Sequence, residues 1–524
     1  MANNNHKEYI EKLNTFVKNN NSKLTADKII TILKSIKNNP NISNKRWIWE
    51  LMQNATDVKY ENEKISIKII IDKDKLEFMH NGKYFRIEDI LGLLQQVSSK
   101  SSQNLDGQTG KFGTGFIGTH LLSDIIDVKG ILKINENDFR QFKVSLDRSE
   151  KISEKLSKNI EDSIELLYHI DDRKDLFISK ENYLQNRKET DYDTTFTYYL
   201  KDEEKKKSAK EGIKDLNNTL PITLITLHNK IKQVTIIDNL EKNEMTYISN
   251  FDKENKNDVS ESSVEIIKKE GETKFKEIYH FLSYLKVDME EKKEILRLIL
   301  QVLKTENDEE IILIEREADK PVLYRNFPLI GSNEFHMPFI VDGFNFNPIE
   351  SRSGILLNGG NNANNLDVHE NLNILSEAYD SSIKFIELIL KKYNYKLVNK
   401  FLLANSRFPK PIVNFDEYAE NWFLEKQKYF REKIRNFKLI KNDKLNQLLL
   451  PIFNENINNE FYNIVSDLNI RKKNNKIPAD NYKGWYNIII EQNNEIKGLK
   501  IENNKYIKSW GSTKNEETGE VELN

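Results

Sequence analysis

The sequence predicts an α+β protein with more than one domain. Trp47, Leu51 and Ala55 recur at the spacing of one helix face, and residues 65–71 then alternate with the period of a strand. The chain has 524 residues, which at roughly 100 to 200 residues per domain indicates two to four cores. The expected domains are 1–205, which mixes helices and strands, 206–360, also α+β, and 361–524, which is mostly helical.

The composition excludes several classes of function. Lys and Arg total 80 against 82 for Asp and Glu, which gives a formal charge of −2. The chain therefore has no net positive charge to attract nucleic acid or an anionic membrane. The absence of cysteine excludes disulfides, thiolate zinc sites, iron–sulfur clusters and a cysteine nucleophile. The histidines are scattered, and no two share a helix face at the spacing of a zincin motif.

The hydropathy of the chain predicts a cytoplasmic protein without a membrane partner. No apolar run approaches the ~18 residues that cross a bilayer. The polar first ten residues also lack the apolar segment of a secretion signal.

The first region is expected to alternate between helices and strands. Ser43 is a candidate N-cap for a helix over 45–59, and a short polar turn joins strands over 65–71 and 75–79 into a hairpin. The polar stretch 98–110 has no apolar period, which predicts a loop or lid. Further helices are predicted over 7–18, 25–37, 87–97 and 110–125, and further strands over 125–134, 139–147 and 193–200.

The charged stretch 201–215 is interpreted as a solvated linker or exposed helix, and the first domain boundary is placed there. The elements predicted beyond it are a strand pair or strand–helix unit (221–238), helices (277–285, 292–304, 366–403 and 417–470) and strand-rich segments (311–332 and 335–348).

The helix at 45–59 carries the first candidate site residues. Glu50, Asn54 and Asp57 are spaced i, i+4 and i+7, so they project from one stripe beside the apolar face. A carboxylate held against a core can accept a proton from water, and an amide oxygen one turn away can coordinate Mg²⁺. The alternative is an ordinary solvated helix surface.

Two further segments contain glycines where a ligand could approach the backbone. The hairpin ends in His80-Asn81-Gly82, with Phe85 soon after, although a plain Asn-Gly turn would look the same. Later, three glycines precede an apolar helix, so backbone N–H groups and the positive helix end could converge on phosphate oxygens. This glycine segment comprises Gly110, Lys111, Phe112, Gly113, Thr114, Gly115 and Phe116, and Ser99 and Lys100 lie upstream as further anion ligands.

Taken in order, these segments resemble the GHKL ATPase superfamily, whose fold is shared by Hsp90, MutL, type II topoisomerases, MORC proteins and sensor histidine kinases. Residues 50–57 resemble its first motif, His80 to Gly82 stand where its adenine-contacting Asp-x-Gly lies, and Gly110 to Gly115 resemble its glycine box. Residues 193–200 resemble its late strand, in which a threonine, here Thr194, lies near the adenine. The resemblance covers about residues 25–205 and implies a GHKL (Bergerat) α/β sandwich with a mixed sheet, followed by a transducer-like domain.

The resemblance implies an ATP and Mg²⁺ site. Glu50 would orient and deprotonate the attacking water, and Asn54 would bind Mg²⁺. This glutamate favours hydrolysis over histidine kinase activity, because sensor histidine kinases usually lack a water-activating carboxylate at that position. The implied nucleotide-binding residues are Asn54, Asp57, His80, Asn81, Gly82, Phe85, Ser99, Lys100, Gly110, Lys111, Phe112, Gly113, Thr114, Gly115, Phe116 and Thr194.

The sequence departs from the family pattern at two places. His80 replaces the usual aspartate, and a neutral imidazole can accept only one hydrogen bond from the adenine amino group. Tyr84 and Phe85 follow where the family often has a second glycine. The His-Asn-Gly variant resembles the sacsin-type and bacterial Hsp90-like branch, so we interpret it as a subfamily mark.

The expected function is an ATP-hydrolysing conformational switch that forms a homodimer around bound nucleotide and acts on an unidentified protein partner. The alternative is a non-catalytic nucleotide-binding or protein-interaction module with a degenerate site, for which His80 is the main support. Analogy with relatives suggests a bacterial anti-phage or DNA-processing system. Arg352 is a candidate for the transducer's phosphate-sensing residue, or else a surface ion pair. The Lys-rich stretch 471–476 is interpreted as solvated surface, so the sequence does not support a nucleic-acid partner.

Overall fold

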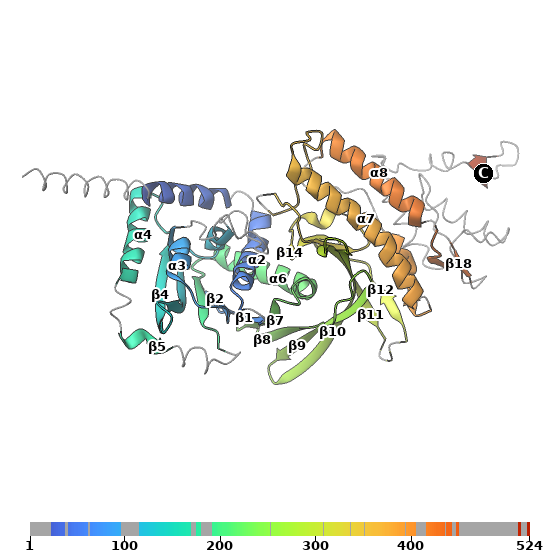
Figure 1. Ribbon diagram of the computed structural model, residues 1–524. Helices are drawn as coiled ribbons and strands as arrows, with labels where there is room; N and C mark the ends of the chain where they lie inside the picture. The colour runs from blue at the N-terminus through green and yellow to red at the C-terminus, as the bar shows by residue number, and fades with distance from the viewer. Residues whose placement is uncertain are drawn as a thin grey trace, which may run out of the picture. The chain divides into compact units, whose positions relative to one another are not determined.

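The structure is a computed structural model that describes the chain in segments separated by gaps (Figure 1). The described residues are 22–36, 40–60, 63–95, 115–168, 174–179, 191–251, 253–305, 307, 309–335, 337–349, 352–393, 395–404, 415–434, 436–442, 447–449, 512–514 and 521–523.

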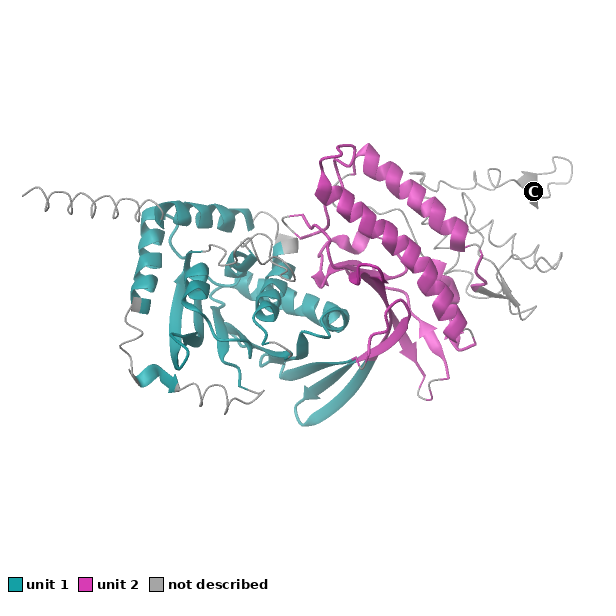
Figure 2. Cartoon of the chain, in the orientation of Figure 1, with its two compact units in different colours: residues 1–250, 264–278 teal, residues 251–263, 279–524 magenta. Residues whose placement is uncertain are grey.

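The chain divides into two compact units, which Figure 2 shows in different colours. Unit 1 comprises Met1–Asn250 and Val264–Ile278, and unit 2 comprises Phe251–Ser263 and Tyr279–Asn524. Both units contain helices and strands, so the predicted α+β class is confirmed. The contacts divide the chain after Asn250, whereas the sequence predicted a boundary at 205/206.

A mixed sheet forms the body of unit 1. Its strands are β1 (Ile65–Ile71), β2 (Lys75–His80), β3 (Ile125–Lys133), β4 (Asp138–Asp147), β5 (Phe177–Ser179), β6 (Thr194–Tyr199), β7 (Ile231–Asp238) and β8 (Asn243–Asn250). The spatial order is β8-β7-β1-β2-β6-β3-β4-β5. β1 runs parallel to β7, and the other neighbours in this order are antiparallel.

The first hairpin shows why a period of two was visible in the sequence. Ile67 and Ile69 of β1 and Leu76 and Phe78 of β2 are fully buried, whereas the residues between them are half-buried. Successive side chains of a strand point to opposite faces, so the alternation reports that one face of the sheet is covered more than the other. The predicted hairpin is confirmed.

Helices cover the sheet of unit 1, and Figure 1 shows α2 and α6 on the same side of β1, β2 and β7. The helical segments are residues 22–36, α2 (Pro40–Asp57), α3 (Ile87–Gln95), η1 (Gly115–Leu121, a 3-10 helix), α4 (Ser153–Tyr168), η2 (Lys174–Leu176) and α6 (Glu203–Thr226). Helix α2 begins at Pro40, and proline fits the first turn of a helix because the N–H that it lacks would have no partner there. The predicted N-cap at Ser43 is wrong because Ser43 lies three residues inside the helix. Its hydroxyl donates to the Ile36 carbonyl at 2.9 Å.

The charged stretch that was interpreted as a linker or exposed helix begins α6, which is a structural helix of unit 1. Asp202 caps it by accepting a hydrogen bond from the Lys205 N–H at 2.9 Å. One face of the helix carries the lysines and glutamates, while Ala209 and Gly212 are buried against α2. The indole N–H of Trp47 in α2 donates to the Ser208 carbonyl at 3.2 Å.

Unit 2 combines a second group of strands with two long helices. Its strands include β9 (Val259–Glu270) and β10 (Thr273–Asp288), whose residues 264–278 are counted with unit 1, and β11 (Lys293–Lys304), β12 (Ile311–Leu313), β13 (Leu323–Arg325), β14 (Phe327–Pro328), β15 (Ile340–Gly343) and β16 (Leu397–Val398). The order is β14-β13-β15-β11-β10-β9, with β12 beside β11 and β16 beside β12. The strand-rich segments predicted over 311–332 and 335–348 are confirmed by β12 to β15.

Two helices predicted in this region are wrong, because residues 277–285 and 292–304 lie in β10 and β11, which pair antiparallel. The five residues from Leu296 to Leu300 in β11 are all buried. A strand that is buried on both faces lacks the regular apolar–polar alternation of a half-buried strand, and Arg297 is the single polar residue of this run. Periodicity alone cannot distinguish such a run from a buried helix.

The helices of unit 2 are α7 (Leu366–Tyr393) and α8 (Glu417–Ile434), with the short 3-10 helices η3 (Ser332–Glu334) and η4 (Lys400–Ala404). Buried side chains from α7, α8 and the strands form one hydrophobic core, in which Phe385 contacts Phe339 and Tyr284. The helix predicted over 417–470 ends at Ile434. Short strand pairs follow it, namely β17 (Ile440–Asn442) with β18 (Gln447–Leu449), and β19 (Ser512–Lys514) with β20 (Val521–Leu523).

No helix in the described part of the chain is long and apolar enough to span a bilayer.

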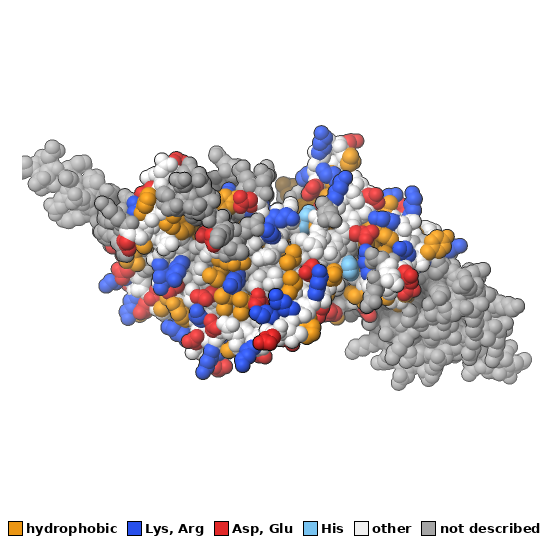
Figure 3. Space-filling model, turned by 90° about the horizontal axis from the view of Figure 1, so that it is seen from below, with side chains coloured by type: hydrophobic (Ala, Val, Ile, Leu, Met, Phe, Trp, Pro, Cys, Tyr) orange, Lys and Arg blue, Asp and Glu red, His pale blue; other side chains and the backbone are white. Residues whose placement is uncertain are grey.

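On the face that Figure 3 shows, Lys and Arg side chains are interspersed with Asp and Glu, as the balanced composition leads one to expect.

Candidate functional site

Helix α2 carries the first candidate residues on its inner side. Its apolar residues Trp47, Leu51 and Ala55 are buried at 1% exposure or less. Glu50 is also buried, with 4% exposure, although it is an acid. Asn54 and Asp57, further along the same stripe, are half-buried. The predicted stripe therefore lies at the edge of the core and not on a fully solvated surface.

The carboxylate of Glu50 lies directly against the backbone of Gly115. A Cβ atom added to Gly115 would stand 1.9 Å from Oε2 of Glu50, closer than any two such atoms can approach. Only glycine fits at this position without displacing the acid. On its other side, Oε1 accepts a hydrogen bond at 2.9 Å from Nε of Arg46, one turn earlier in α2. Glu50 thus connects α2 to the start of η1.

The end of the β1–β2 hairpin forms a second part of the site. His80 and Asn81 are buried at 3% and 8% exposure, and Nδ1 of His80 accepts a hydrogen bond at 3.1 Å from the Gly82 N–H. A neutral imidazole that accepts at Nδ1 carries its proton on Nε2. Nδ1 of His80 is therefore engaged within the hairpin end itself.

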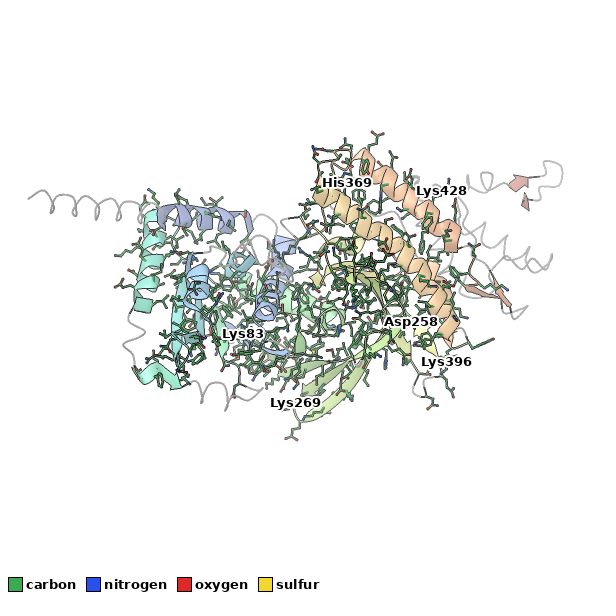
Figure 4. The ribbon with its side chains drawn as sticks, in the orientation of Figure 1. Lys83, Asp258, Lys269, His369, Lys396 and Lys428 are labelled. Atoms are coloured by element: carbon green, nitrogen blue, oxygen red, sulfur yellow. The ribbon has the colours of Figure 1, made fainter. Side chains whose placement is uncertain are left out.

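Asn81 and Gly82 connect this end of the hairpin to Ser66 and Val58. Oδ1 of Asn81 accepts from the Ser66 N–H at 2.7 Å. A Cβ on Gly82 would stand 2.8 Å from Cγ2 of Val58, just after α2, so the close approach of the two segments requires glycine. The next residue, Lys83, which Figure 4 labels, donates its backbone N–H to the Val58 carbonyl at 2.6 Å.

Strand β6 joins the hairpin end to the glycine segment. Thr194 is 1% exposed and stands opposite His80 in the β2–β6 register. Two residues on, the ring of Phe196 lies 6.3 Å from His80 and 5.5 Å from Phe116, measured between centroids. The described part of the site therefore brings together Glu50, Gly115, Phe116, His80 and Thr194, which come from four segments far apart in the sequence.

The structure places the other predicted residues as follows. Phe85 packs its ring edge-on to Phe142 at 5.2 Å, and its backbone bridges to β3, so its ring belongs to the packing over β3 and β4. Ser99, Lys100, Gly110, Lys111, Phe112, Gly113 and Thr114 lie outside the described residues, as does the predicted lid over 98–110.

Three basic residues near the site were not predicted, of which Arg46 is half-buried and the other two are buried. One is Arg46, the partner of Glu50, which its i, i+4 spacing could have revealed. The second is Arg148, 1% exposed, whose guanidinium donates to the Leu94 carbonyl and whose pKa burial lowers to about 10. The third is His120 at the end of η1, whose pKa is lowered to about 3 by burial and then by the charge of Arg148. No local pattern distinguishes the last two residues in the sequence.

The donor set at the site suits a hard cation that also binds phosphate. Magnesium takes one or two protein oxygens and fills its remaining positions with water and phosphate oxygens. The amide oxygen of Asn54 and the carboxylate oxygens of Glu50 are oxygen donors one turn apart on α2. Among the described residues, no group of three His, Asp or Glu side chains is gathered as for a metal held by the protein alone.

In unit 2, Arg352 has a left-handed backbone with a φ of 52°. The pKa of Arg325 in β13 is lowered by burial and then by the charge of Arg352. Asn326, which follows Arg325, donates its backbone N–H at 2.7 Å to the buried Asp342. The candidate arginine Arg352 thus has a second arginine nearby.

Two comparisons with known proteins found no match: no protein-family model matches the chain, and no curated protein matches it.

Proposed function

We propose that unit 1 binds ATP with Mg²⁺ and hydrolyses it, as a conformational switch of the GHKL, Hsp90-like type. The observation that carries this proposal is the contact between the buried carboxylate of Glu50 and the backbone of Gly115. An acid held against the exit of a glycine-rich segment is what in-line attack on a terminal phosphate requires, because the base and the phosphate cradle must face one space.

In the proposed reaction, Oε2 of Glu50 takes a proton from water while the water oxygen attacks the γ-phosphorus. The bond from that phosphorus to the β–γ bridging oxygen breaks, and ADP leaves with the electron pair. Arg46 holds the other carboxylate oxygen at 2.9 Å, which fixes the direction of the base. Asn54 would supply a protein oxygen to Mg²⁺, which when bound neutralises charge on the phosphate oxygens.

The nucleotide base would lie toward the hairpin end and β6. His80 and Thr194 offer polar groups there, and Phe196 and Phe116 offer aromatic surface between the hairpin and the glycine segment. Since Nδ1 of His80 already accepts from Gly82, this nitrogen is not available to accept from the adenine amino group.

The test is Mg²⁺-dependent phosphate release from ATP by the wild-type chain beside Glu50→Ala. Removal of a general base is expected to lower turnover by about 10² to 10⁴-fold while ATP binding persists. The matched control is Glu88→Ala, which removes an exposed acid from α3 of the same unit. Equal phosphate release by wild type and Glu50→Ala would remove Glu50 from this role.

A non-catalytic nucleotide-binding switch is the second candidate, and His80 is the observation that favours it. A histidine whose acceptor nitrogen is occupied cannot reproduce the contact between a carboxylate and the adenine amino group. ATP binding measured by calorimetry, without phosphate release above a no-protein blank, would support this second function over hydrolysis.

Nucleotide-dependent homodimerisation is part of the same proposal. Sedimentation of the wild-type chain with and without a non-hydrolysable ATP analogue tests it directly. A sedimentation coefficient that is the same in both conditions would count against dimerisation around the nucleotide.

A further inference from the structure

A groove of about 320 Å³ lies in unit 1 at the turn end of the β1–β2 hairpin. Its walls come from the end of β1, the N-terminal half of α6 and Leu240, which follows β7. His80 is at the other end of the hairpin, and β1 spans about 20 Å at ~3.3 Å per residue. The groove is therefore separate from the candidate ATP site.

The floor of the groove is apolar. Ile71 and Leu200 are each 2% exposed, and Leu240 stands at the rim with 42% of its surface exposed. A volume near 300 Å³ is at the lower end of the range for ligand sites. The groove is thus large enough for one or two aliphatic side chains.

The acidic residues along the groove already have partners. Glu203 accepts from Nζ of Lys206 at 2.7 Å, and Glu211 accepts from Nδ2 of Asn44 at 2.6 Å. Asp72 accepts from Nδ2 of Asn239 at 2.6 Å. These carboxylates are engaged by the protein itself.

Two lysines at the groove form no hydrogen bond or ion pair with an acid within the described part of the chain, although the charge of Lys210 helps to lower the pKa of Glu203 two turns earlier. Lys73 follows β1 and Lys210 lies on α6, and both are exposed. The other two lysines, Lys206 and Lys207, pair with Glu203 and Glu211 on the same helix. The groove thus presents an apolar floor between two ammonium groups that are available to an incoming anion.

We propose that this groove binds a short acidic peptide segment of a partner protein, with an aliphatic side chain on the floor and flanking carboxylates beside Lys73 and Lys210. The charges of such a segment complement the two lysines, and its aliphatic side chain covers the exposed surface of Leu240. A nucleic-acid backbone has no aliphatic group for the floor. A peptide satisfies both the charge and the floor.

The test is fluorescence anisotropy of the full chain with a labelled peptide of sequence Glu-Glu-Val-Glu-Leu-Glu. The double variant Lys73→Glu with Lys210→Glu is expected to weaken binding about tenfold or more, since it replaces two attractions with two repulsions. The matched control is Lys155→Glu with Lys158→Glu, which makes the same charge change on exposed lysines of α4. Leu240→Ser is expected to weaken binding about fivefold through the floor.

Three results would overturn the proposal. The first is equal affinity of the wild type and the Lys73 and Lys210 double variant. The second is equal binding of a peptide in which serine replaces valine and leucine, because the floor would then have no role. The third is displacement of the peptide by a single-stranded oligonucleotide at a lower concentration than by unlabelled peptide, which would identify a nucleic acid as the better ligand. Circular dichroism of each variant confirms that it is folded.

Discussion

The two ends of the β1–β2 hairpin differ in the burial of their polar side chains. At the β2 end, His80 and Asn81 are buried and hydrogen-bonded to Gly82 and Ser66. At the turn end, Lys73 is exposed beside an open groove. A buried polar group must be bonded because water cannot reach it, whereas an exposed charge keeps its water until a partner arrives. The buried end therefore suits chemistry in a dry site, and the turn end suits reversible recognition.

The largest expected difference between the ends is in stability. Trp47 is fully buried where α2 meets α6, and Val58, just after α2, lies against Gly82 at the His80 end. Trp47→Ala is expected to lower the free energy of unfolding by about 3–5 kcal/mol, as for other buried aromatic residues. Leu240→Ala at the turn end is the control, and it should cost less than about 1 kcal/mol because Leu240 is 42% exposed. Urea unfolding followed by circular dichroism measures both, and similar costs would contradict the comparison.

The next effect concerns two glycines in η1. Gly115→Ala would push a methyl group into the Glu50 carboxylate, whereas a Cβ on Gly118 meets nothing within 4 Å. We expect Gly115→Ala to lower ATP turnover by about 100-fold through a displaced base, and Gly118→Ala to stay within about threefold of wild type. Phosphate release under saturating ATP checks both variants. Two variants with the same activity would show that the contact has no catalytic role.

The stability of the protein is expected to depend on pH through the buried histidine His120 in η1. Burial and Arg148 lower the pKa of His120 to about 3, so the folded chain keeps the ring neutral where the unfolded chain, with a pKa near 6.5, takes up a proton. The unfolded state therefore binds more protons below pH 6.5, and this contribution to stability is lost as the pH falls from there toward 3. Between pH 7 and pH 5 the loss is about 2 kcal/mol.

The variant His120→Gln isolates this contribution. It should be less stable than wild type at pH 7 and should lose about 2 kcal/mol less between pH 7 and pH 5, as measured by urea unfolding at both values. An unchanged pH dependence in the variant would mean that His120 is protonated in the folded chain.

The smallest effect is expected at the turn end. Lys73→Ala and Lys210→Ala remove exposed lysines that form no ion pair among the described residues, so each should change the free energy of unfolding by less than about 0.5 kcal/mol. The same urea titrations measure it. A cost above 1 kcal/mol would mean that these lysines hold the fold together and are not available to a partner.

Much of unit 1 could be predicted from local pattern. The hairpin predicted over 65–71 and 75–79, the helix α3 and the strands β4 and β6 each bury one side more than the other, and one-sided burial gives the sequence a clear period. Strand β3 was also predicted, although residues on both of its faces are buried. The stripe of Glu50, Asn54 and Asp57 was predicted for the same reason, because spacing within a helix fixes which residues share a side.

Unit 2 was harder to predict because the middle of β11 is buried on both faces. All five residues from Leu296 to Leu300 are buried and Arg297 is the single polar residue among them, so the run has no regular alternation that would distinguish a strand from a helix. The length of α6 was also missed. Its charged face suggested a linker, while the contact of Gly212 with Trp47, which makes it a structural helix, depends on a residue far away in the chain.

For the candidate site, the sequence by itself determined which side chains could do chemistry and which of them share a helix or strand, because those relations are local. Tertiary structure alone decided that Gly115 lies against Glu50, that Phe196 stands between His80 and Phe116, and that Gly82 meets Val58. The same holds for the groove, whose lysines come from a hairpin turn and a helix. Such contacts join segments distant in the chain, and they form only when the sheet order and helix packing bring those segments together.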